Sequence, residues 1–136
     1  MDNLSPEQRK KAMHGVKSEN TTPEVFVRHL LRAMGYVGYR LHWAKLPGKP
    51  DIVFIKKKKA IFVHGCFWHA HDCRRGSRIP KTNRLYWKKK IKRNQLRDLD
   101  TIKQLHALDW DVLVVWECDI ADPDSLKENL RTFLHL

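Results

Sequence analysis

The sequence predicts a single α/β domain over residues 1–136, with a mixed central β-sheet flanked by helices. Helical and strand patterns follow one another in the order ααβββαβα, which favours a sheet with helices on its faces. Two short apolar runs, 51–55 and 60–63, are separated by charged residues and predict an antiparallel β-hairpin. The apolar run 112–116 follows a long helical segment, which favours parallel pairing in a covered sheet. A hairpin joined to a parallel strand makes the sheet mixed.

Two helices are expected at the N-terminus. Residues 5–8 combine an N-cap serine, a proline at the first helical position and a capping-box glutamine, and they predict a helix that runs to about Val16. This helix is basic and has few apolar residues, so we interpret 1–18 as an arm rather than part of the core. Residues 22–24 repeat the start signal, and Gly35 is the expected C-cap. The second helix has apolar residues at helical spacing and belongs to the core.

A strand is expected over 39–43, followed by a turn at 46–50 and then by the hairpin. The hairpin tip consists of four lysines, 56–59, which cannot be buried. We interpret this tip as a solvated turn in preference to a phosphate contact.

The C-terminal half is predicted to contain a long helix, a strand and a final helix. The helical segment spans 83–108, and we expect a break near Arg93 because the earlier part is far more basic. The residues expected on its buried side are Leu99, Ile102 and Leu105. The strand 112–116 then leads to Cys118. The last helix begins at Pro123, and its apolar face consists of Leu126, Leu130, Phe133 and Leu134.

The charge balance of the chain points to a polyanionic partner. Lys and Arg total 27 residues against 15 Asp and Glu, which gives a net charge of +12 and a pI of about 9.9. Such a surplus in a small domain favours nucleic acid over a merely soluble basic protein. A membrane is disfavoured, because no apolar run is long enough to span one and no basic helix has a broad aromatic face. The polar N-terminus predicts no secretory signal.

A metal site is predicted in the loop 64–73, which directly follows the apolar strand 60–63. The chain has three cysteines and no secretory features, so metal binding is favoured over disulfide formation. The expected ligands form a Cys3His set typical of structural zinc: Cys66, His71, Cys73 and Cys118. Asp72 and His69 are competing ligands that spacing does not exclude.

A second metal site is predicted at Asp51, which stands at the head of an apolar strand after a proline. Mg²⁺ prefers one or two carboxylates together with water and substrate phosphate. The neighbouring strand ends at Val63 and His64, so these residues are expected close to Asp51, and a backbone carbonyl there would offer a further oxygen ligand. The alternative is an aspartate that caps a turn.

The remaining loop residues indicate phosphodiester chemistry and base contacts. His69 is a candidate general base, and Asp98 or Asp100 is its expected carboxylate partner. The aromatic pair 67–68, and a tryptophan at 87 among lysines, resemble the wedges that unstack base steps. Packing in the core is the alternative interpretation of each aromatic residue.

The motif His64-Gly-Cys-Phe-Trp-His-x-His-x-Cys73, taken with Leu46-Pro-Gly-x-Pro-Asp51 and Trp116-Glu-Cys118, resembles the very short patch repair (Vsr) endonucleases. The resemblance covers nearly the whole chain. It implies a type II restriction endonuclease-like fold with an added structural zinc. It also implies a Mg²⁺-dependent enzyme that nicks one DNA strand 5′ of the thymine in T·G mismatches, which arise when 5-methylcytosine deaminates.

The resemblance also implies roles for individual residues. Asp51 would be the main Mg²⁺ ligand, assisted by the Val63 carbonyl. His64 and Glu24 would lie nearby. The general base would be His69, oriented by Asp98. The implied zinc ligands are Cys66, His71, Cys73 and Cys118. The implied DNA contacts are Met13, Val16, Phe67, Trp68, Trp87, Lys90 and Asn94.

One departure from restriction enzymes is shared with the repair family: residues 62–64 replace the Asp/Glu-x-Lys part of the nuclease signature. Two alternatives stay open, a less selective Mg²⁺-dependent nuclease and a zinc-stabilised DNA-binding module without catalysis. The expected partner is double-stranded DNA with a T·G mismatch. We expect a monomer in the cytoplasm, associated with the nucleoid through DNA.

Overall fold

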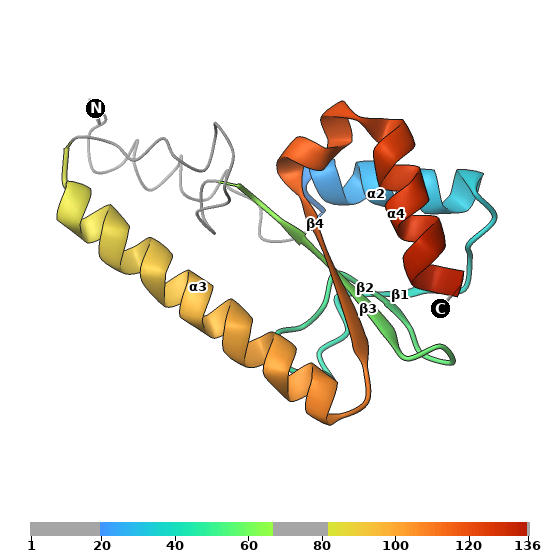
Figure 1. The fold of residues 1–136 in the computed structure, drawn as a ribbon, viewed down its shortest axis with the longest axis horizontal. Coiled ribbons are helices and arrows are strands. Elements are labelled where there is room, and N and C mark those ends of the chain that lie inside the picture. The colour runs from blue at the N-terminus through green and yellow to red at the C-terminus, as the bar shows by residue number, and fades with distance from the viewer. Residues whose placement is uncertain (1–19, 67–81, 136) are drawn as a thin grey trace.

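The computed structural model describes residues 20–66 and 82–135 (Figure 1). Its elements are α2 (Thr22–Ala33), β1 (Arg40–Leu41), β2 (Ile52–Phe54), β3 (Lys59–His64), α3 (Arg84–Ala107), β4 (Asp111–Trp116), the 3-10 helix η1 (Glu117–Ala121) and α4 (Pro123–His135). The helix expected over 5–16, and the arm 1–18 that contains it, lie outside the described residues. None of the described helices is long and apolar enough to cross a membrane.

The four strands form one mixed sheet in the order β1-β2-β3-β4. β1 pairs with β2, and β2 with β3, in antiparallel fashion. β3 and β4 are parallel, and His64 is in register with Trp116 at their common end. The predicted hairpin and the predicted parallel strand are both confirmed. The expectation that all four lysines 56–59 stay unburied is wrong for Lys59, which lies in β3, is 3% exposed and donates to Asp111 Oδ2 at 2.5 Å.

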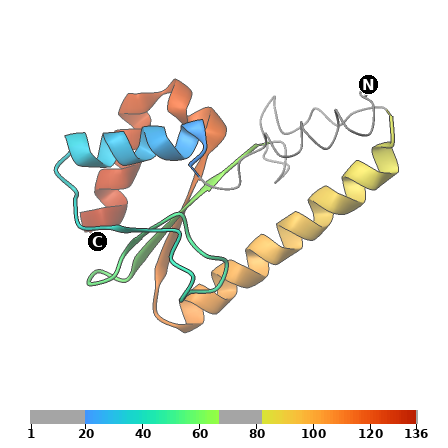
Figure 2. The same cartoon turned by 180° about the vertical axis from the view of Figure 1, so that it is seen from behind.

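Helices cover both faces of the sheet, with α2 and α4 on one side and α3 on the other (Figures 1 and 2). Successive strand residues point to opposite faces. Accordingly Ile61 packs with α2 and α4, whereas its neighbours Ala60 and Phe62 pack with Leu105 of α3. The core therefore has two parts, one on each face of the sheet.

The two helices of the first face follow the sequence signals closely. Thr21 caps α2 by accepting a hydrogen bond from the Glu24 amide, and Gly35 has the positive φ of 87° expected just beyond a helix. In α4 the four residues predicted to be buried are buried. Local capping signals and the spacing of apolar residues were therefore sufficient to predict α2 and α4.

Helix α3 differs from its prediction in two ways. It is continuous from Arg84 to Ala107, so the predicted break near Arg93 is wrong. The segment contains neither glycine nor proline, and a change in basicity alters the helix surface without removing a backbone hydrogen bond. Leu99 is 67% exposed rather than buried, because it lies six residues before the buried Leu105 and therefore on a different face of the helix. Leu105 is fully buried, as predicted.

The strand expected over 39–43 is shorter than predicted. β1 contains only Arg40 and Leu41, because His42 adopts a positive φ of 46° that regular strand geometry does not allow. Backbone pairing with the next strand nevertheless continues, since the His42 amide donates to the Asp51 carbonyl at 3.0 Å. The chain thereby brings residue 42 beside the head of β2.

Candidate active site

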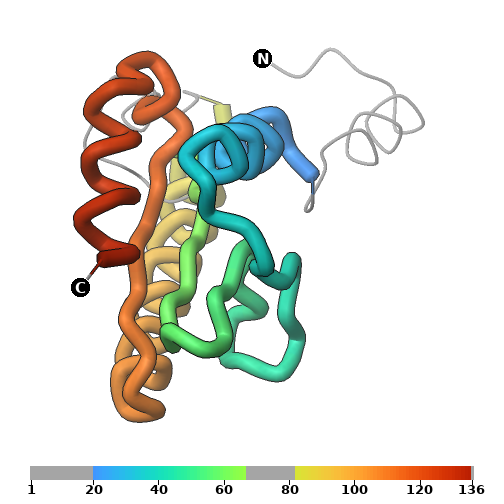
Figure 3. The backbone as a smooth tube through the Cα atoms, turned by 90° about the vertical axis from the view of Figure 1, so that its right-hand side faces the viewer, coloured from blue at the N-terminus to red at the C-terminus, as the bar shows by residue number. Residues whose placement is uncertain are grey.

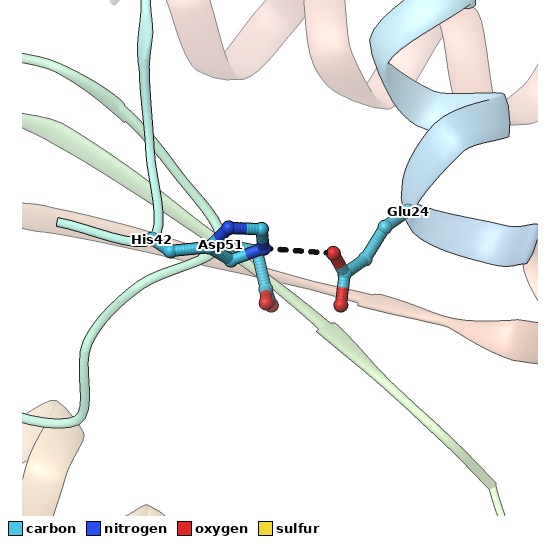
Figure 4. Close-up of side chains that lie close together, drawn as sticks. All are labelled: Glu24, His42 and Asp51. Carbon is cyan, nitrogen blue, oxygen red and sulfur yellow. Dashed lines mark hydrogen bonds and ion pairs between the residues drawn. The ribbon is translucent and has the colours of Figure 1, made fainter. Parts of the chain in front are cut away.

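Three side chains from different parts of the fold meet beside the β1–β2 edge of the sheet (Figure 4). Glu24 lies in the first turn of α2, His42 follows β1, and Asp51 precedes β2. Their nearest ligand atoms all lie within 4.8 Å of one another. Helix α2 lies above the segment that contains β1 and β2 (Figure 3), so this meeting depends on tertiary packing.

The carboxyl group of Asp51 is held close to β3. Its Oδ2 atom accepts a hydrogen bond of 2.7 Å from the Val63 amide. Burial raises the pKa of Asp51 from 3.8 to about 7, the Val63 hydrogen bond opposes this shift, and the Glu24 carboxylate adds to it. The nearby His42 ring has a smaller opposing effect on the same pKa. Asp51 is therefore a carboxyl group whose negative charge is poorly compensated by the protein, and a cation would stabilise it.

The carboxylate of Glu24 is almost completely buried, and the residue is 2% exposed. Its Oε2 atom lies 2.9 Å from the Asn20 amide, 3.2 Å from an Arg28 guanidinium nitrogen and 3.0 Å from His42 Nε2. Arg28 also forms an ion pair with Glu24 one helical turn away, which balances its charge. Of the two carboxylates, Glu24 is thus the better compensated.

His42 was not among the residues predicted from the sequence. It falls in a segment expected to be a regular strand, and neither its positive φ nor its contact with Glu24 is visible in a local pattern. The only available signal was a histidine on the strand next to Asp51.

The structure places Val63 and His64 at the end of β3. The Val63 amide contact brings the backbone of this residue beside Asp51, as predicted. The His64 ring is buried against aromatic neighbours, with ring centroids 5.7 Å from Phe62 and 5.3 Å from Trp116. Among the described residues, the group within 4.8 Å of Asp51 contains His42 rather than His64.

The predicted zinc ligands are described only in part. Cys66 is fully buried and Cys118 is half-buried in η1. Each follows a residue of the pair His64–Trp116 by two positions, so both thiols leave the same end of the parallel pair β3–β4. His71 and Cys73, together with the predicted catalytic and DNA-contacting residues at 13, 16 and 67–69, lie outside the described residues.

The site residues predicted on α3 share one face of the helix. Trp87, Lys90, Asn94 and Asp98 are spaced by three, four and four residues, and each is half-buried. The face continues to the buried Leu105. The Lys90 ammonium lies 5.9 Å from the centroid of the Trp87 ring on this face.

The site combines one buried carboxylate, one half-buried carboxylate and an imidazole, in a chain with a net charge of +12. This combination is typical of metal-dependent enzymes that act on a polyanion. Over residues 1–75 the chain matches the model of a family described as DNA mismatch endonuclease Vsr. The protein belongs to this Vsr family and is a DNA endonuclease.

Relatives extend the match over almost the whole chain. The type II nicking enzyme V.XorIIP of Xanthomonas oryzae pv. oryzae is 48% identical over 133 residues, which is 98% of this chain and 96% of the relative. The type II nicking enzyme V.NmeAIP of Neisseria meningitidis is 39% identical over 130 residues, which is 96% of this chain and 91% of the relative. DNA mismatch endonuclease Vsr of Escherichia coli is 37% identical over 124 residues, which is 91% of this chain and 78% of the relative. The resemblance seen in the sequence motifs is therefore confirmed at the level of the family.

Proposed function

We propose that the protein is a Mg²⁺-dependent mismatch endonuclease that nicks one DNA strand 5′ of the thymine in T·G mismatches. Such mismatches arise from deamination of 5-methylcytosine, and the nick would initiate very short patch repair. The observation that carries the proposal is the closeness of the buried Glu24 and the half-buried Asp51 beside the sheet, in a chain that belongs to the Vsr family. The nicking relatives, which match nearly the full chain, support cleavage of a single strand.

The donors at this site suit a hard divalent cation. Asp51 would be the principal Mg²⁺ ligand and the Val63 carbonyl a second one, with Glu24 and His64 nearby. The chemistry fits, because Asp51 is a half-buried oxygen donor whose negative charge is incompletely balanced. When bound, Mg²⁺ would polarise the phosphate and lower the pKa of an attacking water.

The proton acceptor proposed for that water is His69, oriented by Asp98. Asp98 is half-buried on the face of α3 that continues into the core, whereas Asp100 is exposed and accepts a hydrogen bond of 2.7 Å from Gln104. The placement of these two aspartates supports Asp98 as the partner. A carboxylate there would fix the imidazole tautomer and increase its basicity.

A structural zinc is proposed for the loop 64–73. Its ligands would be Cys66, His71, Cys73 and Cys118. The support is the parallel register of β3 and β4. Cys66 and Cys118 each follow the paired residues His64 and Trp116 by two positions, at the same end of the two strands. Zinc held in this way would join the loop to β4, and the mixed sheet with helices on both faces supports a type II restriction endonuclease-like arrangement.

DNA contacts are proposed from three segments. The arm 1–18 would act through Met13 and Val16, and the loop through Phe67 and Trp68. On α3 the contacts would come from Trp87, Lys90 and Asn94, which share a face. Large apolar residues can enter a base step most easily at a mismatched pair. We further propose that the enzyme acts as a monomer at the nucleoid, in the cytoplasm, where its substrate lies.

A nicking assay on matched and T·G duplexes tests the proposal. The expected result is one nick 5′ of the mismatched thymine, with Mg²⁺ required and EDTA inhibitory. Equal cleavage of T·A and T·G duplexes would instead identify a less selective nuclease. Salt-dependent binding without cleavage under any divalent ion would identify a DNA-binding module.

A further inference from the structure

His42 is held in an unusual backbone conformation at the edge of the site. Its φ of 46° lies in the left-handed region, which non-glycine residues adopt infrequently. Two backbone hydrogen bonds fix this geometry, from the His42 amide to the Asp51 carbonyl at 3.0 Å and from the Trp43 amide to the Pro50 carbonyl at 3.3 Å. Strained residues are retained where the surrounding structure requires them, often in functional sites.

The His42 side chain uses this backbone position to reach Glu24. Its Nε2 atom lies 3.0 Å from Glu24 Oε2, and the two side chains are 13% and 3% exposed. A carboxylate oxygen only accepts hydrogen bonds, so Nε2 carries a hydrogen in this contact. An Arg28 guanidinium nitrogen lies 3.5 Å from the same Nε2 atom.

The donors around Glu24 are distributed unevenly between its two oxygens. The Asn20 amide, Arg28 and His42 all lie within hydrogen-bonding distance of Oε2. The lone pairs of Oε1 are not used by these donors. In Figure 4 the contact to His42 runs from one oxygen of Glu24, while the second oxygen points away from it.

Resting on the function proposed above, we propose that His42 is a positioning residue of the nuclease centre, which with Arg28 fixes one oxygen of Glu24 and leaves the other available to the cation beside Asp51. A glutamate side chain has three rotatable torsions, and the neighbouring Asp51 carboxylate repels it once both are ionised. The hydrogen bond from His42 holds Glu24 against that repulsion. Because Glu24 belongs to α2 and His42 to the segment after β1, this hydrogen bond also connects the helix to the edge of the sheet.

A positioning role explains the contacts better than direct coordination by His42. The Nε2 hydrogen is already directed at Glu24, and the adjacent guanidinium would repel a divalent cation at that nitrogen. Partners that orient a metal ligand commonly affect metal affinity strongly without touching the metal.

Two substitutions separate the side-chain contact from the backbone conformation. In H42N, asparagine tolerates the left-handed conformation, but its amide nitrogen is one bond too short to reach Glu24. In H42Q, the amide nitrogen is as many bonds from Cα as the imidazole Nε2 and can donate to Oε2. H29Q is the matched control, because His29 is an exposed histidine on α2. The measurements are Mn²⁺ binding by calorimetry without DNA, the Mg²⁺ dependence of nicking, and the melting temperature.

H42N should weaken Mn²⁺ binding, and raise the Mg²⁺ concentration for half-maximal nicking, by about 10-fold or more. H42Q should recover most of both losses, and H29Q should match the wild type. The proposal is overturned if folded H42N binds Mn²⁺ like the wild type. It is also overturned if folded H42Q binds Mn²⁺ as weakly as H42N, because the donor to Glu24 would then not be what cation binding requires. A wild-type protein that binds Mn²⁺ but nicks no duplex would overturn the proposed function, while the calorimetry would still decide the role of His42.

Discussion

The amide of Val63 donates a 2.7 Å hydrogen bond to the Oδ2 atom of Asp51. This contact joins the head of β2 to the end of β3, which leads into the loop that contains His69, His71 and Cys73. One hydrogen bond thus fixes the carboxyl group with respect to the strand that leads to the rest of the site. It does not fully offset the burial of the charge, since the pKa of Asp51 is still raised to about 7.

Replacing Asp51 by Asn should abolish nicking and stabilise the metal-free protein. The folded protein keeps the Asp51 proton up to about pH 7, whereas the unfolded chain releases it near pH 3.8. The stabilisation from this group is therefore complete below pH 3.8 and is lost as the pH rises through 7. Asn keeps the shape and an acceptor for Val63 without the charge. At pH 8 in EDTA, D51N should melt about 5 °C above the wild type, and the difference should shrink at pH 5.

The control for this comparison is D100N, which removes an exposed carboxylate on α3. Its melting temperature should follow that of the wild type across the same pH range. If D51N melts below the wild type at pH 8, Asp51 is not the poorly compensated charge that its burial indicates.

Protons and the divalent cation should compete for Asp51. The carboxyl group must lose its proton before it can act as a ligand, so cation binding becomes weaker as the pH falls below about 7. At saturating Mg²⁺ the wild type should gain more melting temperature at pH 8 than at pH 6, and D51N should gain little at either pH. Scanning calorimetry with and without Mg²⁺ measures the shift in melting temperature for the wild type and D51N at each pH. An equal gain at both pH values would contradict the assignment.

Much of the fold could be predicted because it depends on local patterns. The capping signal before Glu24, the hairpin around the lysine tip and the buried face of α4 each lie within one short segment. The predicted break in α3 is wrong because a change in basicity along the helix surface does not interrupt its backbone hydrogen bonds. His42 was missed for a different reason, since its partner Glu24 is 18 residues away and meets it only after α2 packs on the sheet.

The site was predictable to the extent that it coincides with strand ends. Asp51 and Val63 were expected together from the hairpin, and the structure brings them together. The arrangement of Cys66 and Cys118 beyond paired strand ends agrees with a shared metal, but the zinc site itself stays a prediction.

Replacing Cys118 by Ser should remove bound zinc and loosen the loop 64–73. A structural site loses most of its affinity when one thiolate is replaced by a weaker ligand, and the zinc is proposed to join the loop to β4. Elemental analysis of the purified wild type should give one zinc per chain, and C118S should give a small fraction of that. Proteolysis should then cut C118S within 67–81 faster than the wild type. If C118S keeps its zinc, Cys118 is not a ligand.

Gly48 lies in the turn that leads to Asp51, and its replacement by Ala should destabilise the protein for two separable reasons. Gly48 has a φ of 74°, where an alanine side chain is strained by about 1 kcal/mol. A Cβ atom there would also lie 2.3 Å from the Thr101 Cγ2 atom of α3 and 3.3 Å from the Phe62 ring. Overpacking of this kind costs about 1–3 kcal/mol, so G48A should lose about 2–4 kcal/mol in urea unfolding.

The double variant G48A/T101A distinguishes the two causes. Alanine at 101 lacks the Cγ2 atom, so the clash with α3 is relieved while the backbone strain at Gly48 stays. Relative to T101A alone, the double variant should therefore lose only about 1 kcal/mol of unfolding free energy, because the backbone strain stays while the clash is gone. If G48A is equally destabilising with and without Thr101, the contact between this turn and α3 does not explain the requirement for glycine. The positive φ would then be its whole cause, and the turn that positions Asp51 would not depend on its close approach to α3.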